Sequence, residues 1–227
     1  EGKLAYLQEK AEISLEPAGI TGLMDACRVF KNTGYTGTVL VVFKETGAAH
    51  FLKHPVHELF GESLSLHHFF NPVLIRETEE QLATAADDEQ RISIVERLLT
   101  GHLQNDKEYS LVDQAIAYIR QSGGRIRIAE LARCLNISQS PLEKQFRRIT
   151  GASPKKFSSI VRFKNLTEML TIQNYQELIY QAGYYDQAHL IKDFKKFSGK
   201  TPEQYVKGTS GSSEINDFLQ SQESVGK

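Results

Sequence analysis

Residues 183–205 read GYYDQAHLIKDFKKFSGKTPEQY, and a second copy of this pattern lies earlier in the chain. Residues 131–138 match residues 178–185 at an offset of 47, and beyond Asp186, which is one extra residue, the match continues at an offset of 48. The pairs at the second offset are Leu142 with Leu190, Phe146 with Phe194, Gly151 with Gly199, Ser153-Pro154 with Thr201-Pro202, and Phe157 with Tyr205. A repeat this dense, with its glycines and prolines in register, indicates two copies of one structural unit.

Each copy has the pattern of two short helices joined by a sharp turn. The first helix is expected at about residues 128–135 in the first copy and at about 176–182 in the second. Asn136 and Gly183 hold the turn position, and both residue types tolerate the positive φ that such a turn favours. The pattern therefore predicts a helix-turn-helix in each copy.

The second helix of each copy has a predicted start, end and buried face. Ser138 and Asp186 are suitable N-caps, and Gly151 and Gly199 are suitable C-caps. Pro141 falls in the first turn of the first copy's second helix, where its missing N–H group costs little. The side chains expected to be buried are Leu142, Phe146 and Ile149 in the first copy, and Leu190, Phe194 and Phe197 in the second.

The charges separate the chain into an acidic part and a basic part. Residues 1–108 carry 10 Lys and Arg against 17 Asp and Glu, a net charge of −7, whereas residues 109–208 carry 16 against 8, a net charge of +8. A basic domain favours a nucleic-acid partner. No apolar run reaches the roughly 18 residues of a membrane-spanning helix, so no membrane partner is expected. No secretion signal opens the sequence, and we expect a cytoplasmic protein.

The stretch from Ile126 to Tyr205 resembles the DNA-binding domain of the AraC family of bacterial transcription regulators, and residues 183–205 match the family's signature nearly residue for residue. The resemblance implies an all-α domain of seven helices over residues 109–208. In that domain a linker helix, here at about 155–170, holds two recognition helices against adjacent major grooves. The expected function is sequence-specific, DNA-binding transcription regulation, with no enzyme activity, no catalytic residues and no cofactor.

The acidic half is expected to complete an α+β fold. Residues 1–70 are expected to be rich in strands, because Thr38–Phe43 is an apolar run with β-branched residues and glycines punctuate the region as turns. This region resembles, more weakly, the last part of a cupin-like sensor whose early strands are absent. Residues 71–108 are expected to form a helical linker, with Asp87-Asp88 opening its second helix. Residues 209–227 are expected to be a flexible tail.

Four side chains on the first recognition helix are candidates for reading base edges. Their spacing of i, i+3, i+4 and i+7 places them on one helical face, opposite the apolar stripe. They are Ser140, Glu143, Lys144 and Arg147. Arg or Lys can bond to guanine, and Glu can accept from the N4 group of cytosine. An ordinary solvated face is the alternative interpretation.

Further candidates lie on and near the second recognition helix. The base-reading candidates there are Gln187, Ala188, Ile191 and Lys192. An exposed Ile191 would pack on a thymine methyl group, whereas a buried Ile191 would only serve the core. The candidates for phosphate contacts, which position a protein without reading sequence, are Arg148, Lys155, Lys156, Lys195 and Lys196.

The histidines and cysteines give no expectation of a metal site. Five histidines of the acidic half lie close together in the sequence, His50, His54, His57, His67 and His68, and His54 and His57 are the candidates for metal ligands. A cupin metal site needs an H-x-H pair with a downstream carboxylate, and the sequence lacks that spacing. Packing and surface roles are therefore favoured over metal binding. Cys134, in the first helix of the first copy, is expected to be a buried, inert thiol rather than a redox sensor.

Double-stranded DNA is the expected main partner. RNA polymerase is a further candidate, and residues 1–108 are candidates for binding a small-molecule effector or a dimer partner. One alternative function is a protein-interaction module that keeps this fold without binding DNA. The other is the DNA-binding part of a repair methyltransferase, which needs a zinc-bound cysteine cluster, whereas this chain has only Cys27 and Cys134.

Overall fold

The computed structural model describes residues 3–8, 11–34, 37–104, 109–170, 183–184 and 186–209. The chain splits into two compact units. The first consists of Glu1–Met24, Arg28–Ala117 and Ile128–Pro154. The second consists of Asp25–Cys27, Tyr118–Arg127 and Lys155–Lys227. Each unit is described by itself, and the sequence-based division at residues 70, 108 and 208 stays a prediction.

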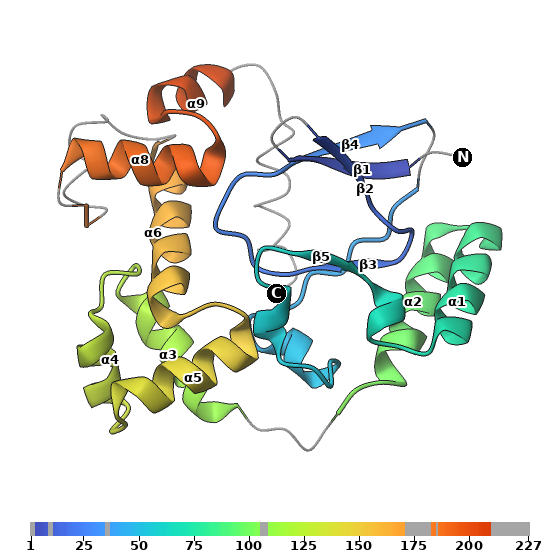
Figure 1. The fold of residues 1–227 in the computed structure, drawn as a ribbon, viewed down its shortest axis with the longest axis horizontal. Coiled ribbons are helices and arrows are strands. Elements are labelled where there is room, and N and C mark those ends of the chain that lie inside the picture. The colour runs from blue at the N-terminus through green and yellow to red at the C-terminus, as the bar shows by residue number, and fades with distance from the viewer. Residues whose placement is uncertain are drawn as a thin grey trace. The chain divides into compact units, whose positions relative to one another are not determined.

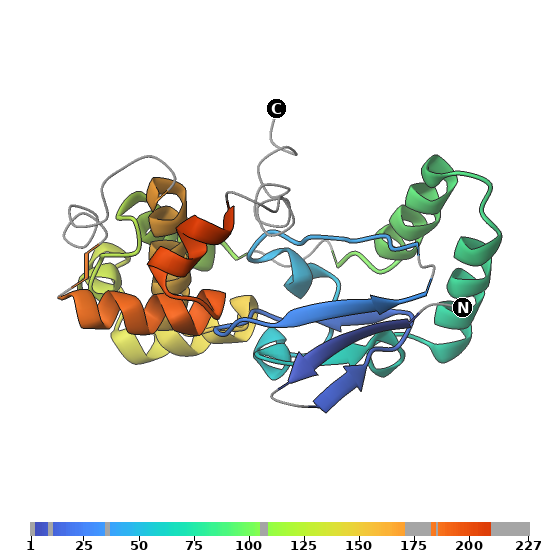
Figure 2. The same ribbon diagram turned by 90° about the horizontal axis from the view of Figure 1, so that it is seen from above.

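Two small antiparallel sheets lie in the first compact unit (Figures 1 and 2). The larger sheet has the strand order β2 (Ala11–Ser14), β1 (Lys3–Gln8), β4 (Val29–Thr33). The smaller pairs β3 (Gly19–Thr21) with β5 (Ser63–Ser65). In the larger sheet Tyr6 is buried and stands opposite both Ile13 and Phe30. The strand-rich character expected for this region is therefore present, in short strands.

The expected strand at Thr38–Phe43 is not formed. Residues 37–44 form neither helix nor strand, and Leu40 is 62% exposed, with Val39, Val41 and Val42 also exposed. A strand needs a neighbouring strand to take up its backbone N–H and C=O groups, and the apolar run by itself supplies none. The prediction was wrong because composition records a preference for extended backbone but not the presence of a partner.

Residues 72–100, within the predicted helical linker, contain two helices. They are α1 (Pro72–Thr84) and α2 (Asp88–Thr100). Both begin at a side-chain cap: Asn71 accepts from the backbone N–H of Val73 at 2.9 Å, and Asp87 accepts from that of Gln90 at 2.8 Å. Such caps satisfy backbone donors that have no partner inside the helix, and the start predicted at Asp87-Asp88 is correct.

The first helix-turn-helix has the predicted form. It follows α3 (Ser110–Gln121) and consists of α4 (Ile128–Cys134) and α5 (Gln139–Thr150). Asn136 turns the chain between them at a φ of +51°. Leu131, Leu142 and Phe146 are fully buried where α4 packs on α5. Ile137 is only half-buried, so the turn is closed mainly by its backbone conformation.

Two further short helices of the first compact unit support α5. Two 3-10 helices, η1 (Gly47–His50) and η2 (Val56–Leu59), pack against α5. Gly151 ends α5 in the left-handed conformation, with a φ of +90°. A Cβ atom on Gly151 would lie 3.2 Å from the carbonyl oxygen of Val56. Glycine is thus required here both by the backbone angle and by the close approach of η2.

The second compact unit is built on one long helix. Its helices are α6 (Pro154–Leu170), α8 (Gln187–Ser198) and α9 (Pro202–Thr209). Phe163 on α6 contacts two aromatic rings of α8, Phe194 edge-on at 5.2 Å and Phe197 stacked at 5.0 Å between ring centroids. The buried cluster around them contains Leu166, Leu170, Tyr184, Leu190, Phe194 and Tyr205. The linker helix expected at about 155–170 is therefore present.

Part of the second copy lies outside the described residues. This applies to the expected helix at 176–182 and to most of the expected tail at 209–227. Gly183 adopts the expected positive φ, +75°, and Tyr184 after it is buried. Asp186 caps α8, and Gly199 ends it at a φ of +73°. The start, the end and the buried side chains of α8 thus follow the sequence pattern, with Phe197 half-buried.

Gly151→Ala should destabilise the protein more than Gly61→Ala. Both glycines have a positive φ, which costs a non-glycine residue about 1–2 kcal/mol, but only Gly151 has an atom within the reach of a new Cβ. The free energy of unfolding, measured with urea, should fall by about 1 kcal/mol more for Gly151→Ala, in line with the cost of overpacking. Equal losses would show that η2 moves aside without cost.

Asp186→Ala should cost more stability than Ser138→Ala. The Asp186 carboxylate accepts from the backbone N–H of His189 at 2.7 Å, whereas Ser138 holds the N-cap position of α5 without a side-chain hydrogen bond. Losing an N-cap hydrogen bond costs about 0.5–2 kcal/mol, so thermal unfolding should show that loss for Asp186→Ala only. A larger loss for Ser138→Ala would contradict the assignment of the caps.

Candidate nucleic-acid interface

The exposed face of α5 carries the predicted base-reading residues. Ser140, Lys144 and Arg147 are exposed, while Leu142 and Phe146 on the opposite face are fully buried. Glu143 is half-buried, and its carboxylate accepts a hydrogen bond from the side-chain amide of Gln139 at 2.8 Å. The helix thus presents two cations and one hydroxyl group to solvent, in a row along its axis.

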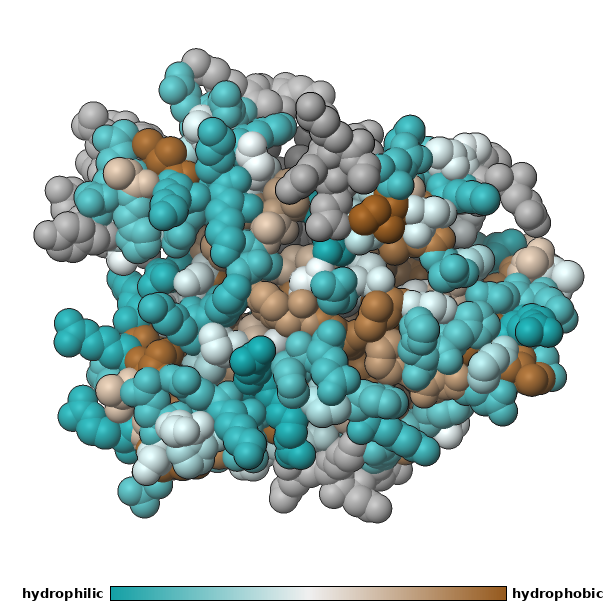
Figure 3. All heavy atoms as spheres, viewed as in Figure 1, coloured by the Kyte–Doolittle hydropathy of each residue, from teal (hydrophilic) through white to brown (hydrophobic). Residues whose placement is uncertain are grey.

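The exposed face of α8 carries the second set. Gln187, Ala188 and Lys192 are exposed. Ile191 is half-buried, because it borders the side of the helix that buries Leu190 and Phe194. Figure 3 shows mostly hydrophilic side chains over α5 and α8, with scattered hydrophobic ones. Gln187 and Lys192 are thus the exposed polar members of the set on α8, and Ile191 lies at the border of its buried side.

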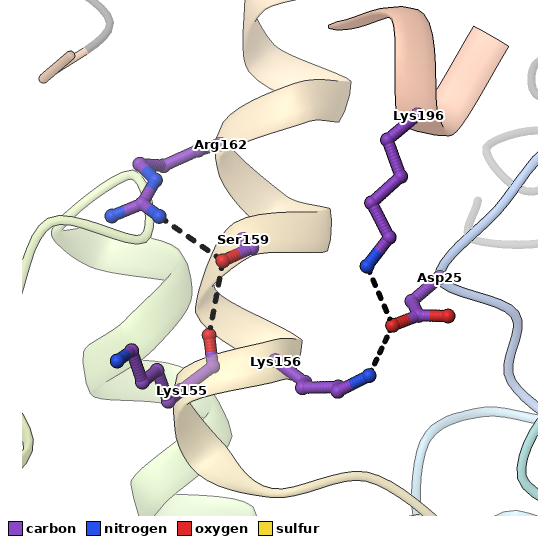
Figure 4. Close-up of polar contacts among 6 residues, drawn as sticks. All are labelled: Asp25, Lys155, Lys156, Ser159, Arg162 and Lys196. Carbon is purple, nitrogen blue, oxygen red and sulfur yellow. Dashed lines mark hydrogen bonds and ion pairs between the residues drawn. The ribbon is translucent and has the colours of Figure 1, made fainter. Parts of the chain in front are cut away.

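The predicted phosphate contacts fall into two groups. Arg148, Lys155 and Lys195 are exposed. Lys156 and Lys196 are about half exposed, with side-chain exposures of 46% and 48%, and both are ion-paired to one carboxylate, that of Asp25. The distance from Lys196 Nζ to Asp25 Oδ2 is 2.8 Å, and Lys156 Nζ donates to the same oxygen (Figure 4). One acidic residue therefore holds two of the five candidates.

Asp25 is a site residue that the sequence analysis missed. It lies 131 residues from Lys156 and 171 from Lys196, and no motif surrounds it. Its segment, Asp25–Cys27, belongs to the second compact unit, and the backbone N–H of Cys27 donates to the carbonyl of Lys196 at 3.0 Å. The only available signal was the local acidity of the N-terminal half, which does not single out one carboxylate.

The lysine pair controls the ionisation of Asp25. Partial burial raises the pKa of its carboxyl group, but hydrogen bonds and charge from Lys156 and Lys196 outweigh this effect, so the pKa lies below its ordinary value. A carboxyl group whose pKa is lower in the folded protein than in the unfolded chain stabilises the folded state at pH values above its unfolded-state pKa. That stabilisation is lost as the pH falls through the folded-state pKa. The carboxylate is therefore fully charged at neutral pH.

A small hollow adjoins these charges. It has a volume of about 70 Å³ and is lined by Asp25, Lys156, Ser159, Asp193, Lys196 and Phe197. Its polar walls come from α6, α8 and the Asp25–Cys27 segment. The hollow is too small for more than a few water molecules, so it fits a charged surface contact better than a small-molecule site.

Arg162 on α6 organises the neighbouring face of the second compact unit. Its guanidinium donates to the Ser159 hydroxyl at 3.0 Å and to the carbonyl of Gly124 at 3.4 Å (Figure 4 shows the first of these). It also lies 5.8 Å from the ring centre of Tyr184. Burial, followed by the charge of Asp193, raises the pKa of Tyr184 to about 12, while Arg162 lowers it. Arg162 is thus a structural cation, which the sequence did not identify.

Several histidines of the first compact unit pack against aromatic rings. His50 lies edge-on to Tyr109 at 4.9 Å, and His54 lies edge-on to Phe69 at 5.7 Å, measured between ring centroids. Within the described residues no three His, Cys, Asp or Glu side chains gather as metal ligands would. Likewise, none of the described helices is long and apolar enough to cross a membrane.

Cys134 is exposed, contrary to the expectation that it is buried. The buried face of α4 is formed by Leu131 and Ala132. Around the helix axis, Ala132 and Cys134 lie on opposite sides of Leu131. The core covers the side of Ala132, so Cys134 points toward solvent. The motif placed the residue on the correct helix and on the wrong face.

Comparisons with known proteins find one matching family and related sequences. Residues 131–208 match the family described as "Helix-turn-helix domain". The Msm operon regulatory protein of Streptococcus mutans is 28% identical over 155 residues, which are 66% of this chain and 55% of that protein. The raffinose operon transcriptional regulatory protein RafR of Pediococcus pentosaceus is 29% identical over 96 residues, 41% of this chain and 35% of that one. The chain spans about half or less of the length of these relatives.

A solved structure is similar to part of this chain. The C-terminal domain of AraT, a response regulator from Geobacillus stearothermophilus, shares 26% identity with a TM-score of 0.42, covering 47% of this chain and 90% of that one. The match to the helix-turn-helix family covers the turn at Asn136, the whole of α5 and the whole of α8. By that match, and by the signature at residues 183–205, the chain is identified as carrying the helix-turn-helix domain of AraC-type transcription regulators over residues 131–208.

Proposed function

We propose that the chain is a sequence-specific DNA-binding transcription regulator in which α5 and α8 are the recognition helices of two tandem helix-turn-helix units. The observation that carries this proposal is the division of α5 into two faces. Phe146 and Leu142 are fully buried, while Lys144 and Arg147 stand exposed on the other side. An α-helix fits the major groove, where Arg and Lys can bond to guanine.

The second copy supports engagement of a second groove. In α8, Gln187 and Lys192 are exposed, while Leu190 and Phe194 are buried. Between α5 and α8 in the sequence runs α6, whose 17 residues make a helix about 26 Å long. Adjacent major grooves on one side of B-DNA lie about 34 Å apart. A helix of that length between the two recognition helices, together with a modest bend in the DNA, suits one asymmetric site of about 16–20 base pairs.

The N-terminal half takes the regulatory role in this proposal. Residues 1–70 would form a partial cupin-like sensor, joined by the helical residues 71–108 to the DNA-binding domain. A small-molecule effector or a second copy of the chain would bind through residues 1–108, and RNA polymerase would be contacted from the DNA-bound protein. Two relatives are named as regulators of operons. We propose the same role, regulation of an operon, for this chain.

Lys144→Ala should relax sequence preference, whereas Lys155→Ala should not. A lost contact to a base edge costs about 1–3 kcal/mol and affects one or two positions of the site, while a lost phosphate contact weakens all sequences alike. Selection of bound duplexes from a random pool by the whole chain, followed by binding titrations, measures both effects. The reverse pattern would mean that the base-reading face of α5 is rotated from its assigned position.

The same titrations test DNA binding itself. With about six to ten phosphate contacts, affinity should fall about 10³–10⁵-fold between 50 and 200 mM salt. An affinity that does not change with salt, or no binding at low salt, would favour the protein-interaction module instead.

Footprinting should show two protected major grooves one helical turn apart. In the double variant Gln187→Ala/Lys192→Ala, protection of one groove should weaken while the other persists, because α8 loses its polar contacts and α5 keeps its own. The matched double variant Ser140→Ala/Lys144→Ala should weaken the other groove. If only one groove is protected and the α8 substitutions do not affect it, α8 supports the fold and does not enter a groove.

A further inference from the structure

We propose that Asp25 is an intramolecular latch that occupies the phosphate-binding lysines Lys156 and Lys196 and thereby weakens binding to DNA. This inference rests on the proposed function, because it assigns a regulatory contact to the same surface. A carboxylate and a phosphate group are both oxyanions that lysine ammonium groups bind by charge-assisted hydrogen bonds. Asp25 and a DNA phosphate would therefore compete for the same two donors.

The carboxylate of Asp25 is shared by two lysines. Both lysines donate to the same oxygen, Oδ2 of Asp25, although Lys156 comes from the first turns of α6 and Lys196 from the last turn of α8 (Figure 4). One carboxylate thus brings together cations from two helices, as a phosphate group would. The Asp25 side chain is 21% exposed, so the contact lies at the surface, where a phosphate could replace it.

The latch segment is held by backbone contacts as well as by charge. The N–H of Cys27 donates to the carbonyl of Lys196 at 3.0 Å. The sulfur of Cys27 lies 3.4 Å from the place that a Cβ atom of Gly199 would occupy. Gly199 ends α8 and has no side chain, which leaves room for Cys27. The segment Asp25–Cys27 therefore packs against the C-terminal end of α8, and this contact keeps Asp25 close to Lys156 and Lys196.

The energetic scale favours a regulatory role over a folding role. Ion pairs that solvent can reach add little to the stability of the folded state, and both lysine partners of Asp25 are about half exposed. The same pairs have a larger effect on DNA binding. Asp25 removes two cations from the phosphate-binding set, and each phosphate contact contributes about 0.9 to the slope of log K against log salt. A small cost in stability thus accompanies a measurable change in affinity.

The test compares Asp25→Asn with a matched control in the whole chain. Glu12→Gln also removes one negative charge and one lysine partner, because Glu12 pairs with Lys31 at 3.1 Å, and Lys31 is not a phosphate candidate. Affinity for a duplex selected by the wild-type chain is measured at several salt concentrations. Asp25→Asn should bind about two- to thirtyfold more tightly at low salt, with a slope steeper by up to about 1.8, and Glu12→Gln should match the wild type.

A double-mutant cycle locates the effect. Lys156→Ala/Lys196→Ala should weaken binding more in the Asp25→Asn background than in the wild-type background, because only there are both lysines released. If Asp25→Asn binds like the wild type while the wild type binds duplex with the expected salt dependence, the latch is wrong and the proposed function stands. If Glu12→Gln gains as much as Asp25→Asn, the effect is general charge and the latch is also overturned.

Two further outcomes separate the latch from the proposed function and from folding. If neither the wild type nor Asp25→Asn binds duplex at low salt, the proposed function fails and the latch fails with it. Cooperative thermal unfolding of each variant is checked, and Asp25→Ser replaces Asp25→Asn if that variant does not fold. If both variants lose cooperative unfolding, the Asp25 contact is a folding element, which overturns the latch.

Discussion

Burial of one phenylalanine in each second helix orients the surfaces of both copies. Phe146 in α5 and Phe194 in α8 are fully buried, and each is accompanied by a fully buried leucine one turn earlier. Removing a buried phenylalanine side chain costs a protein about 3–5 kcal/mol, which is a large share of the stability of an ordinary domain. With that side held inward, helical geometry places the polar residues outward, and the helix cannot rotate without exposing its phenylalanine.

The backbone at the ends of these helices serves the same orientation. Asn136 and Gly183 turn the chain at positive φ before the second helix, and Gly151 and Gly199 end it at positive φ. The two copies reach these turns with different residues, asparagine in one and glycine in the other. Both residue types tolerate the left-handed region better than others do, and at Gly183 a Cβ atom would also lie 2.8 Å from Cγ of Arg125, so glycine leaves that space to the arginine.

The charges of the second compact unit are arranged by partners rather than by periodicity. Lys156 and Lys196 meet at Asp25, whereas Arg162 turns to Ser159 and the carbonyl of Gly124. Cations that look alike in the sequence thus have different surroundings. Under the proposed latch, the two lysines bound to the Asp25 carboxylate would exchange it for a phosphate, while Arg162 is tied to the protein's own backbone. This distinction separates candidates for DNA contact from residues that hold α6 in place.

The repeat, the helix starts and ends, and the buried stripes of α5 and α8 were predictable from the sequence. These features depend on neighbours within about one helical turn, and the sequence records such neighbours directly. The family signature at residues 183–205 also identified the domain, and helical spacing placed Lys144 and Arg147 on one face of α5, where both are exposed.

Only the tertiary structure decided which distant groups meet. It left Thr38–Phe43 without a strand partner, exposed Cys134, and joined Asp25 to lysines 131 and 171 residues away. A strand needs a second strand, and an ion pair needs the chain path to bring two side chains together. Neither requirement is written in local spacing, so periodicity indicates which side of a helix is polar, and the fold decides what each charge on that side touches.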